Sequence, residues 1–156
     1  MKSHRITIPF PDPKPDKNAA YKLSYEKPSN VNVVGSYASK TMVKSDDVLS
    51  VDMVVVMPVS IFQEKDYLNY RYFYKRAYYL ACIAAGLHDS TKNDLMLSFE
   101  YLNGNTLHPI LVAKAFSGRT ETCNNWRLLT CSRRQVKYRC KVSGPHYSCS
   151  PIIFLQ

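Results

Sequence analysis

The sequence contains no hydrophobic run long enough to span a membrane. The N-terminus, MKSHRITIPFPDPKPDK, has basic residues but no continuous apolar segment of the kind found in a signal peptide. The longest apolar run, AYYLACIAAGL at residues 77–87, is shorter than the about 20 residues that a transmembrane helix needs. We therefore predict a protein that is neither secreted nor inserted in a membrane.

The spacing typical of structural zinc sites is also absent. The last four of the five cysteines are eight or nine residues apart, with His146 nearby, whereas compact zinc sites usually pair their ligands two to four residues apart. An odd number of cysteines without an export signal argues against a disulfide framework. We expect reduced thiols and no metal site, and the five are Cys82, Cys123, Cys131, Cys140 and Cys149.

Acidic residues are few compared with basic ones. The chain has 12 Asp and Glu against 21 Lys and Arg, which gives a formal net charge of +9. A soluble chain with this balance is attracted to polyanions, and nucleic acid is the most frequent of these. At 156 residues and 46% hydrophobic, the chain can bury one core, so we predict a single domain.

The first half of the chain predicts an extended leader and two strands. Residues 1–30 alternate proline with polar residues, which favours extended backbone. The β-branched residues 30–34 predict a strand that ends in a turn at Gly35-Ser36 and a short helical turn over residues 36–42. The valine run at residues 51–57 predicts a strand covered on both faces and stopped by the following proline.

A long helix is predicted after this second strand. Ser60 and Gln63 have the spacing of a capping box, and the helix should then cover residues 64–87. Spacings of three and four place Tyr70, Phe73, Ala77, Leu80, Ala84 and Leu87 on one face. A second face would carry Arg71, Lys75, Tyr78 and Cys82 and would be basic and aromatic.

The rest of the chain predicts more sheet and an irregular tail. Residues 94–114 read as a hairpin around Asn103-Gly104, a dipeptide that favours a tight turn. Pro109 should demote the second strand of the hairpin to an edge or delay its start. Residues 124–132 could add one more strand, and from about Ser132 the chain is densely basic without a clear period.

The segment from Gly35 to Asp52 resembles part of a nucleotide-transfer site. Enzymes of the polymerase-β-like superfamily use a Gly-Ser turn for phosphate, followed by two acids at i and i+2 of a strand. Such acids share one face and hold two metal ions roughly 3.5–4 Å apart. Here the corresponding positions are Ser50 and Asp52, so one carboxylate is missing.

Other acids are poor substitutes for the missing one. Asp46 and Asp47 precede the strand, and adjacent residues point in different directions. Glu100, on the first strand of the hairpin, is a candidate for a third acid, but without the first acid it cannot complete a metal-binding set. We therefore expect no catalytic residues, no metal and no cofactor.

Three segments together resemble one known family. VNVVGSYASKT…SVDMVVVMP, FQEKDYLNYRYFYKRAYYLACIAAGL and LSFEYLNGNTLHP are similar, in this order, to the N-terminal part of the nucleolar RNA-associated protein family (Nrap, also called nucleolar protein six). The block EKDYLNYRYFYKRA is the most specific. The resemblance covers roughly residues 31–112 and cannot be followed past about Leu129.

The resemblance implies an α+β fold, a nucleotidyltransferase-like (polymerase-β-like) mixed sheet with a long packed helix, at residues 31–129. It would follow the leader at 1–30, precede an atypical basic tail at 130–156, and be incomplete. Gly35 and Ser36 match the family's turn, Asp52 its remaining strand acid, and Ser50 the position of the lost acid. Family members are understood as scaffolds without transferase activity in the nucleolar small-subunit processome.

The resemblance and the charge together predict a nuclear, nucleolar scaffold whose partners are pre-ribosomal RNA and other processome proteins. The candidate RNA contacts are Lys65, Arg71, Lys75, Arg133, Arg134 and Lys137. Two alternatives stay open at this point. One is an active RNA nucleotidyltransferase that uses a divalent metal, and the other is a truncated product without an independent function.

Overall fold

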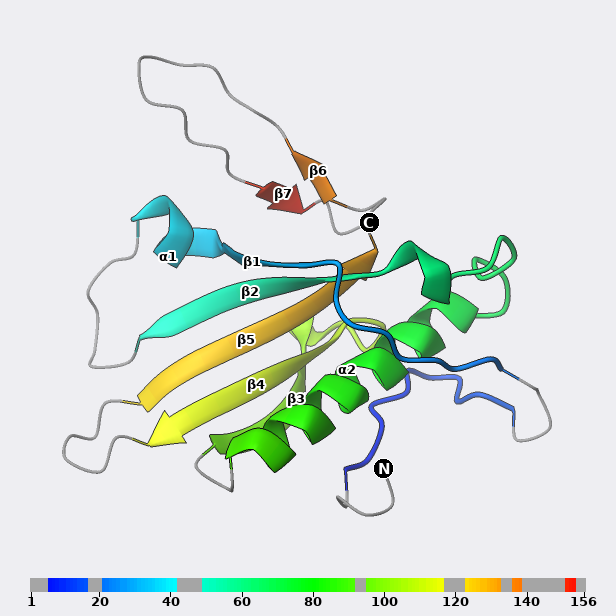
Figure 1. The fold of residues 1–156 in the computed structure, drawn as a ribbon, viewed down its shortest axis with the longest axis horizontal. Helices are drawn as coiled ribbons and strands as arrows, with labels where there is room; N and C mark the ends of the chain where they lie inside the picture. The colour runs from blue at the N-terminus through cyan, green and yellow to red at the C-terminus, as the bar shows by residue number, and fades with distance from the viewer. Residues whose placement is uncertain are drawn as a thin grey trace.

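A computed structural model describes residues 6–16, 21–41, 49–91, 95–116, 123–132, 136–138 and 151–153. Its helices and strands, in chain order, are β1 Asn30–Val34, α1 Gly35–Ser39, β2 Ser50–Met57, η2 Val59–Ile61, α2 Arg71–Thr91, β3 Leu95–Tyr101, η3 Leu102–Gly104, β4 Pro109–Phe116, β5 Cys123–Ser132, β6 Val136–Tyr138 and β7 Pro151–Ile153. Five strands form one sheet in the order β1-β2-β5-β4-β3, and β6 pairs separately with β7. The helix α2 lies across one face of the large sheet (Figure 1).

The sheet is mixed, which confirms the predicted α+β class and the packed helix. The strands β2 and β5 are parallel, and the other three pairs in the sheet are antiparallel. Val55 and Met57 of β2 pack in the cluster under α2, whereas Val54 and Val56 pack with Val34 of β1 on the opposite face. The valine run is therefore buried on both faces, as its composition predicts.

The helix α2 begins at Arg71, seven residues later than the predicted start at residue 64. The backbone N–H of Tyr72 donates to the carbonyl of Asp66 at 2.9 Å, and Asn69 and Tyr70 have the left-handed φ values of 53° and 57°. The capping-box interpretation is wrong, because the Ser60 hydroxyl donates instead to a Glu26 carboxylate oxygen. A long-range contact therefore replaces the local cap.

The buried face of α2 is wider than its spacing predicts. Ala77, Leu80 and Ala84 are almost completely buried, as expected. Tyr79 is buried as well, and its hydroxyl donates to the Glu26 carbonyl at 2.9 Å. The predicted position of Tyr70 on the packed face is wrong, because this residue precedes the helix and is 44% exposed.

The proline-containing leader packs beside the first half of α2 (Figure 1). The Tyr74 hydroxyl donates to the Pro13 carbonyl at 2.7 Å. The rings of Phe10 and Tyr21 meet the Tyr74 ring edge-on at 6.0 and 5.2 Å between centroids. Within residues 6–16 and 21–29 the chain forms no helix or strand, in agreement with the extended backbone that its prolines predict.

The hairpin of β3 and β4 confirms the left-handed turn and the delayed second strand. Asn103 and Gly104 have φ values of 52° and 75°. Pro109 is the first residue of β4 and pairs with Tyr101, where its missing N–H is tolerated. The connection covers residues 102–108 and includes the short η3 helix, so it is longer than the tight turn that the sequence predicts.

His108, at the end of this connection, gives a prediction about pH. Burial and the nearby Arg76 guanidinium lower the pKa of its imidazole below the ordinary value. Below pH about 6.5 the unfolded chain therefore binds a proton that the folded chain does not. The free energy of unfolding consequently decreases as the pH is lowered. Urea denaturation at about pH 7.5 and 5.5 should show this loss, and His108→Gln should reduce it. The matched variant at the exposed His88, His88→Gln, should retain the loss; an equal loss in all three proteins would contradict the prediction.

Candidate functional site

The pairing of β1 with β2 brings the Gly-Ser turn next to the strand acid. Val34 is the register partner of Asp52, so Gly35 follows directly beside the carboxylate. A Cβ atom added to Gly35 would lie 2.8 Å from Asp52 Oδ2, and its φ is +75°. Both the space and the backbone conformation therefore require glycine at this position.

Asp52 is held by an arginine from the neighbouring parallel strand. Arg127 Nε donates to Asp52 Oδ1 at 2.6 Å, and Arg127 Nη2 donates to Asp52 Oδ2 at 3.0 Å. The two residues are register partners of β5 and β2. This two-pronged pair occupies both carboxylate oxygens and neutralises the charge of the strand acid.

The donor set around Asp52 does not fit a pair of divalent metal ions. Ser50 lies on the same face of β2 as Asp52, and it offers a hydroxyl instead of a carboxylate. Glu100 lies on β3, which β5 and β4 separate from β2, so it is about 14 Å away across the sheet. The other acids considered, Asp46 and Asp47, lie outside the described residues. A guanidinium stands where cation binding would need negative charge.

Ser36 contributes little to anion binding in this arrangement. The helix α1 that starts at the Gly-Ser turn has only five residues and no side-chain cap. One turn of helix carries a small dipole, and Ser36 is exposed to solvent. The turn is thus present as predicted, but its main contact is the close approach of Gly35 to Asp52.

Lys75, predicted as an RNA contact on an exposed helix face, is buried. Its side chain is 5% exposed, and Nζ lies 2.6 Å from Asp66 Oδ2. The same ammonium donates to the Ile61 carbonyl at 2.9 Å. The expected exposed face is therefore wrong at this residue, because a partner nine residues earlier in the chain draws the charge into the interior.

The remaining predicted RNA contacts fall into two groups. Lys65 is exposed and Arg71 is half-buried, and both lie where the chain enters α2. Arg133 and Arg134 lie outside the described residues, as does the Lys137 side chain, although its backbone belongs to β6. Tyr78, from the same predicted face, is half-buried, and burial raises the pKa of its hydroxyl.

Sequence reasoning missed Arg127, which binds both carboxylate oxygens of Asp52. A signal for it exists in the sequence, because Arg127 interrupts the otherwise uncharged segment that forms β5. A charge on a central strand is favoured where a neighbouring strand supplies the opposite charge. The sequence does not say which acid it meets, because the pairing of β2 with β5 joins residues 75 positions apart.

The described residues show no metal-binding cluster and no membrane-spanning helix. In the described ranges, no cluster of three or more His, Cys, Asp or Glu side chains could hold a metal ion. Among the helices that the structure describes, none is both long and apolar enough to cross a membrane.

Comparisons with known proteins identify the family. Residues 1–143 match the family described as Nrap protein domain 1, which extends the resemblance on both sides. The chain is 36% identical over 117 residues to U3 small nucleolar RNA-associated protein 22 of Saccharomyces cerevisiae, covering 71% of this chain and 9% of that protein. It is 43% identical over 110 residues to nucleolar protein 6 of Xenopus laevis, with coverage of 70% and 9%. It is 42% identical over 106 residues to nucleolar protein 6 of Homo sapiens, with coverage of 67% and 9%.

These relatives are much longer than the chain, which spans about a tenth of their length. The match nevertheless includes the Gly-Ser turn, the lone strand acid and the helix α2. The chain therefore belongs to the Nrap family and corresponds to its domain 1.

Proposed function

We propose that the chain is a non-catalytic, RNA- and protein-binding scaffold domain of the small-subunit processome. It would act in pre-rRNA processing and small ribosomal subunit biogenesis, and its location would be nuclear and nucleolar. Its partners would be pre-ribosomal RNA and other processome proteins. The names of the relatives, a U3 small nucleolar RNA-associated protein and nucleolar proteins, support this proposal.

The Asp52–Arg127 pair is the observation that carries the non-catalytic part. We infer that the mixed sheet is a nucleotidyltransferase-like, polymerase-β-like framework with its Gly-Ser turn retained. Nucleotide transfer in such a framework needs two carboxylates, and the face of β2 offers Ser50 and an Asp52 already bound by Arg127. This arrangement supports a structural role for Asp52.

The charge balance supports the RNA-binding part. The net charge is +9, and proteins that neutralise phosphates with Lys and Arg release counterions when they bind nucleic acid. We retain Lys65 and Arg71 as RNA contacts together with Arg133, Arg134 and Lys137 of the tail. Lys75 is left out because its charge is buried against Asp66.

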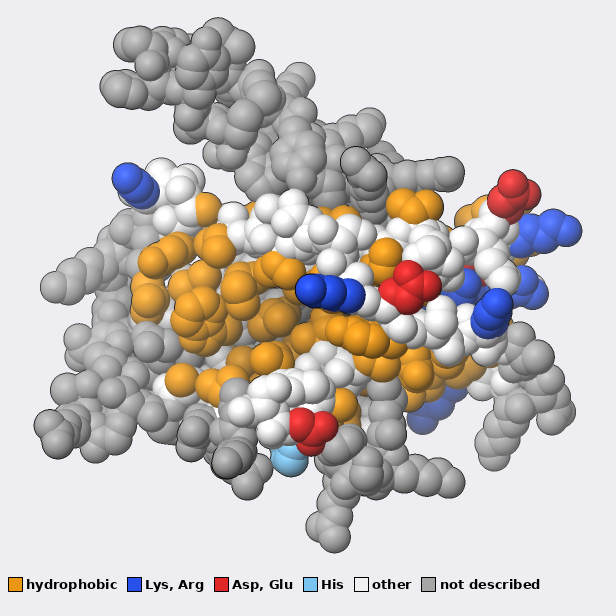
Figure 2. Space-filling view, viewed as in Figure 1, with side chains coloured by type: hydrophobic (Ala, Val, Ile, Leu, Met, Phe, Trp, Pro, Cys, Tyr) orange, Lys and Arg blue, Asp and Glu red, His pale blue; other side chains and the backbone are white. Residues whose placement is uncertain are grey.

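An uncovered apolar surface supports the protein-binding part. Figure 2 shows hydrophobic side chains gathered on the sheet, beside the end of α2. Val31 and Val33 of β1 are 51% and 43% exposed, and their register partners Val55 and Met53 pack in the cluster under α2. An exposed patch of this kind is typical of surfaces that bind another protein.

One experiment tests the RNA-binding part and the non-catalytic part on the whole 156-residue chain. A fluorescent single-stranded RNA is titrated with the protein at several salt concentrations, and nucleoside triphosphates are then added with Mg²⁺ or Mn²⁺. We expect binding that weakens as salt rises, because phosphate contacts release counterions. We expect no change in RNA length on a denaturing gel.

A tail variant and a site variant serve as controls. Replacing Arg133, Arg134 and Lys137 together with alanine should lower the salt slope by about 2, since each phosphate contact contributes about 0.7 for single strands. The absence of RNA binding, or binding without salt dependence, would overturn the RNA part. Nucleotide incorporation that Asp52→Ala abolishes would instead establish the alternative, an active nucleotidyltransferase.

A further inference from the structure

The loop that precedes α2 exposes aromatic side chains to solvent. We call residues 63–70 the tyrosine loop, and Arg71 follows it as the first residue of α2. Tyr67 is 78% exposed, the largest exposed fraction among the large hydrophobic side chains that the structure describes. Tyr70 and Leu68 of the same loop are 44% and 43% exposed. Exposed rings of this kind can stack on unpaired bases or enter a pocket of another protein.

The tyrosine loop is fixed in place by one buried carboxylate. Asp66 is 4% exposed, and its Oδ2 atom accepts a hydrogen bond from the Gln63 N–H at 2.7 Å and from Lys75 Nζ at 2.6 Å. Its backbone carbonyl accepts from the Tyr72 N–H at 2.9 Å. Asp66 therefore ties the loop to the first turn of α2, and a rigid loop loses less entropy when it binds a partner.

The backbone conformation of the loop is unusual. Asn69 and Tyr70 are consecutive residues with φ values of 53° and 57°. A left-handed tyrosine is unfavourable, and such residues persist only where the surrounding contacts impose them. Strain of this kind is concentrated at functional sites, which supports a role for the exposed side chains of the loop.

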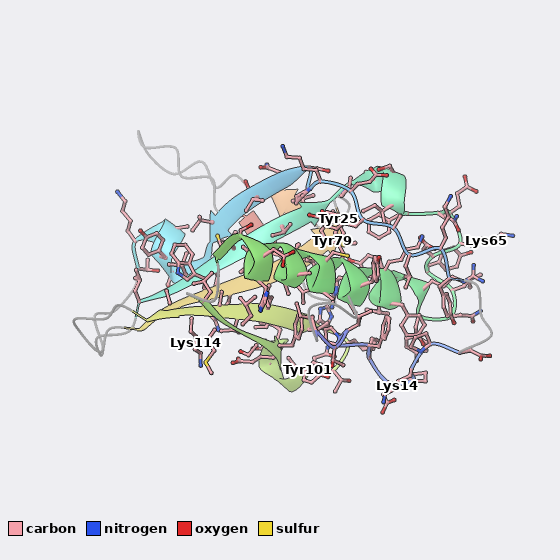
Figure 3. All side chains as sticks on the ribbon, turned by 60° about the horizontal axis from the view of Figure 1, so that its bottom comes forward. Lys14, Tyr25, Lys65, Tyr79, Tyr101 and Lys114 are labelled. Atoms are coloured by element: carbon pink, nitrogen blue, oxygen red, sulfur yellow. The ribbon has the colours of Figure 1, made fainter. Side chains whose placement is uncertain are left out.

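Unpaired cations flank the rings. Within the described part of the chain, neither Lys65 nor Arg71 forms an ion pair, in contrast to Lys75 and Arg127. Lys65 lies at one end of the molecule (Figure 3), and Figure 2 shows Lys and Arg side chains gathered at that end. The exposed Glu64 offsets part of this charge.

Rings next to free cations fit single-stranded nucleic acid. Bases stack on aromatic side chains, while nearby cations contact the phosphates. Base-paired RNA presents no free base face to a tyrosine, so it would lack the stacking contact. The net charge of +9 favours this partner over an apolar pocket of another protein.

We propose that the tyrosine loop is a contact site for single-stranded RNA, in which Tyr67 stacks on an unpaired base and Lys65 and Arg71 bind the adjoining phosphates. This site rests on the proposed function and gives it a location and a mode of contact.

The test measures the affinity of the whole chain for a fluorescent single-stranded RNA of about 12 nucleotides, within the range of sites that such proteins cover. Tyr67→Ala should weaken binding by roughly tenfold, which is within the effect of one stacked base, with an unchanged salt slope. Tyr67→Phe retains the ring and should bind like the unchanged protein. Lys65→Ala should lower the salt slope by about 0.7.

The matched control is Tyr101→Ala, because Tyr101 is 45% exposed on β3 and lies apart from Lys65 (Figure 3). It should leave the affinity unchanged, and thermal melts should show that all variants remain folded. A duplex RNA should bind with the same affinity to the Tyr67→Ala variant and to the unchanged protein.

The outcomes separate this inference from the proposed function. If the unchanged protein binds RNA and Tyr67→Ala behaves like Tyr101→Ala, the tyrosine loop is no RNA site, although the scaffold proposal stands. An equal loss of duplex and single-strand affinity in Tyr67→Ala would overturn the stacking contact. If the unchanged protein binds no RNA, the RNA part of the proposed function fails.

Discussion

Replacing Lys75 with methionine is expected to lower the free energy of unfolding by about 3–5 kcal/mol, the loss found when one partner of a buried ion pair is removed. The reason is the carboxylate left behind. Asp66 is 4% exposed, and without Lys75 its Oδ2 atom would keep only the hydrogen bond from the Gln63 N–H. Urea denaturation followed by circular dichroism measures the change.

Lys65→Met is the matched control, because the same substitution at an exposed lysine should change stability by less than about 0.5 kcal/mol. Replacing both members of the buried pair with apolar residues, Asp66→Leu with Lys75→Met, should recover part of the loss. If Lys75→Met were as stable as Lys65→Met, the pair would have no role in holding the tyrosine loop.

The elements of the fold that the sequence predicts are those set by local features. The strand β2 and the left-handed turn at Asn103-Gly104 follow from local features, a valine run and a dipeptide that accepts positive φ. The start of α2 does not follow from such local features. The helix propensity of residues 64–70 is overridden by the tertiary contact of Asp66 with Lys75 and by the left-handed residues before Arg71.

At the candidate site too, the sequence predicts the local features and not the long-range contact. Gly35, Ser50 and Asp52 lie close together in the sequence, and the period of a strand predicts the common face of Ser50 and Asp52. Arg127 reaches Asp52 only because β5 pairs with β2 in parallel. Periodicity within one strand contains no information about such a partner, so the sequence predicts a missing acid and not the arginine that binds the remaining one.

Gly35→Ala is expected to lower the free energy of unfolding by about 1–3 kcal/mol. Two effects contribute to this loss. The first is the φ of +75°, which costs a residue with a Cβ atom about 1–2 kcal/mol. The second is the approach of the new methyl group to 2.8 Å from Asp52 Oδ2, which forces the carboxylate away from Arg127 and weakens a partly exposed pair worth up to about 1 kcal/mol.

Gly104 provides a control that separates the two effects. It has the same φ of +75°, but no atom lies within 4 Å of an added Cβ. Gly104→Ala should therefore cost only the backbone strain, about 1–2 kcal/mol, and less than Gly35→Ala. Urea denaturation of both variants measures the difference.

A double-mutant cycle then assigns the excess to Asp52. In an Asp52→Ala background the carboxylate is absent, so Gly35→Ala should cost no more than Gly104→Ala, whereas independent sites would simply add. A full cost of Gly35→Ala in that background would mean that the turn is held by something other than the carboxylate. The expected coupling would instead show that the Asp52 carboxylate, held by Arg127, contacts the turn that Gly35 forms and restricts position 35 to glycine.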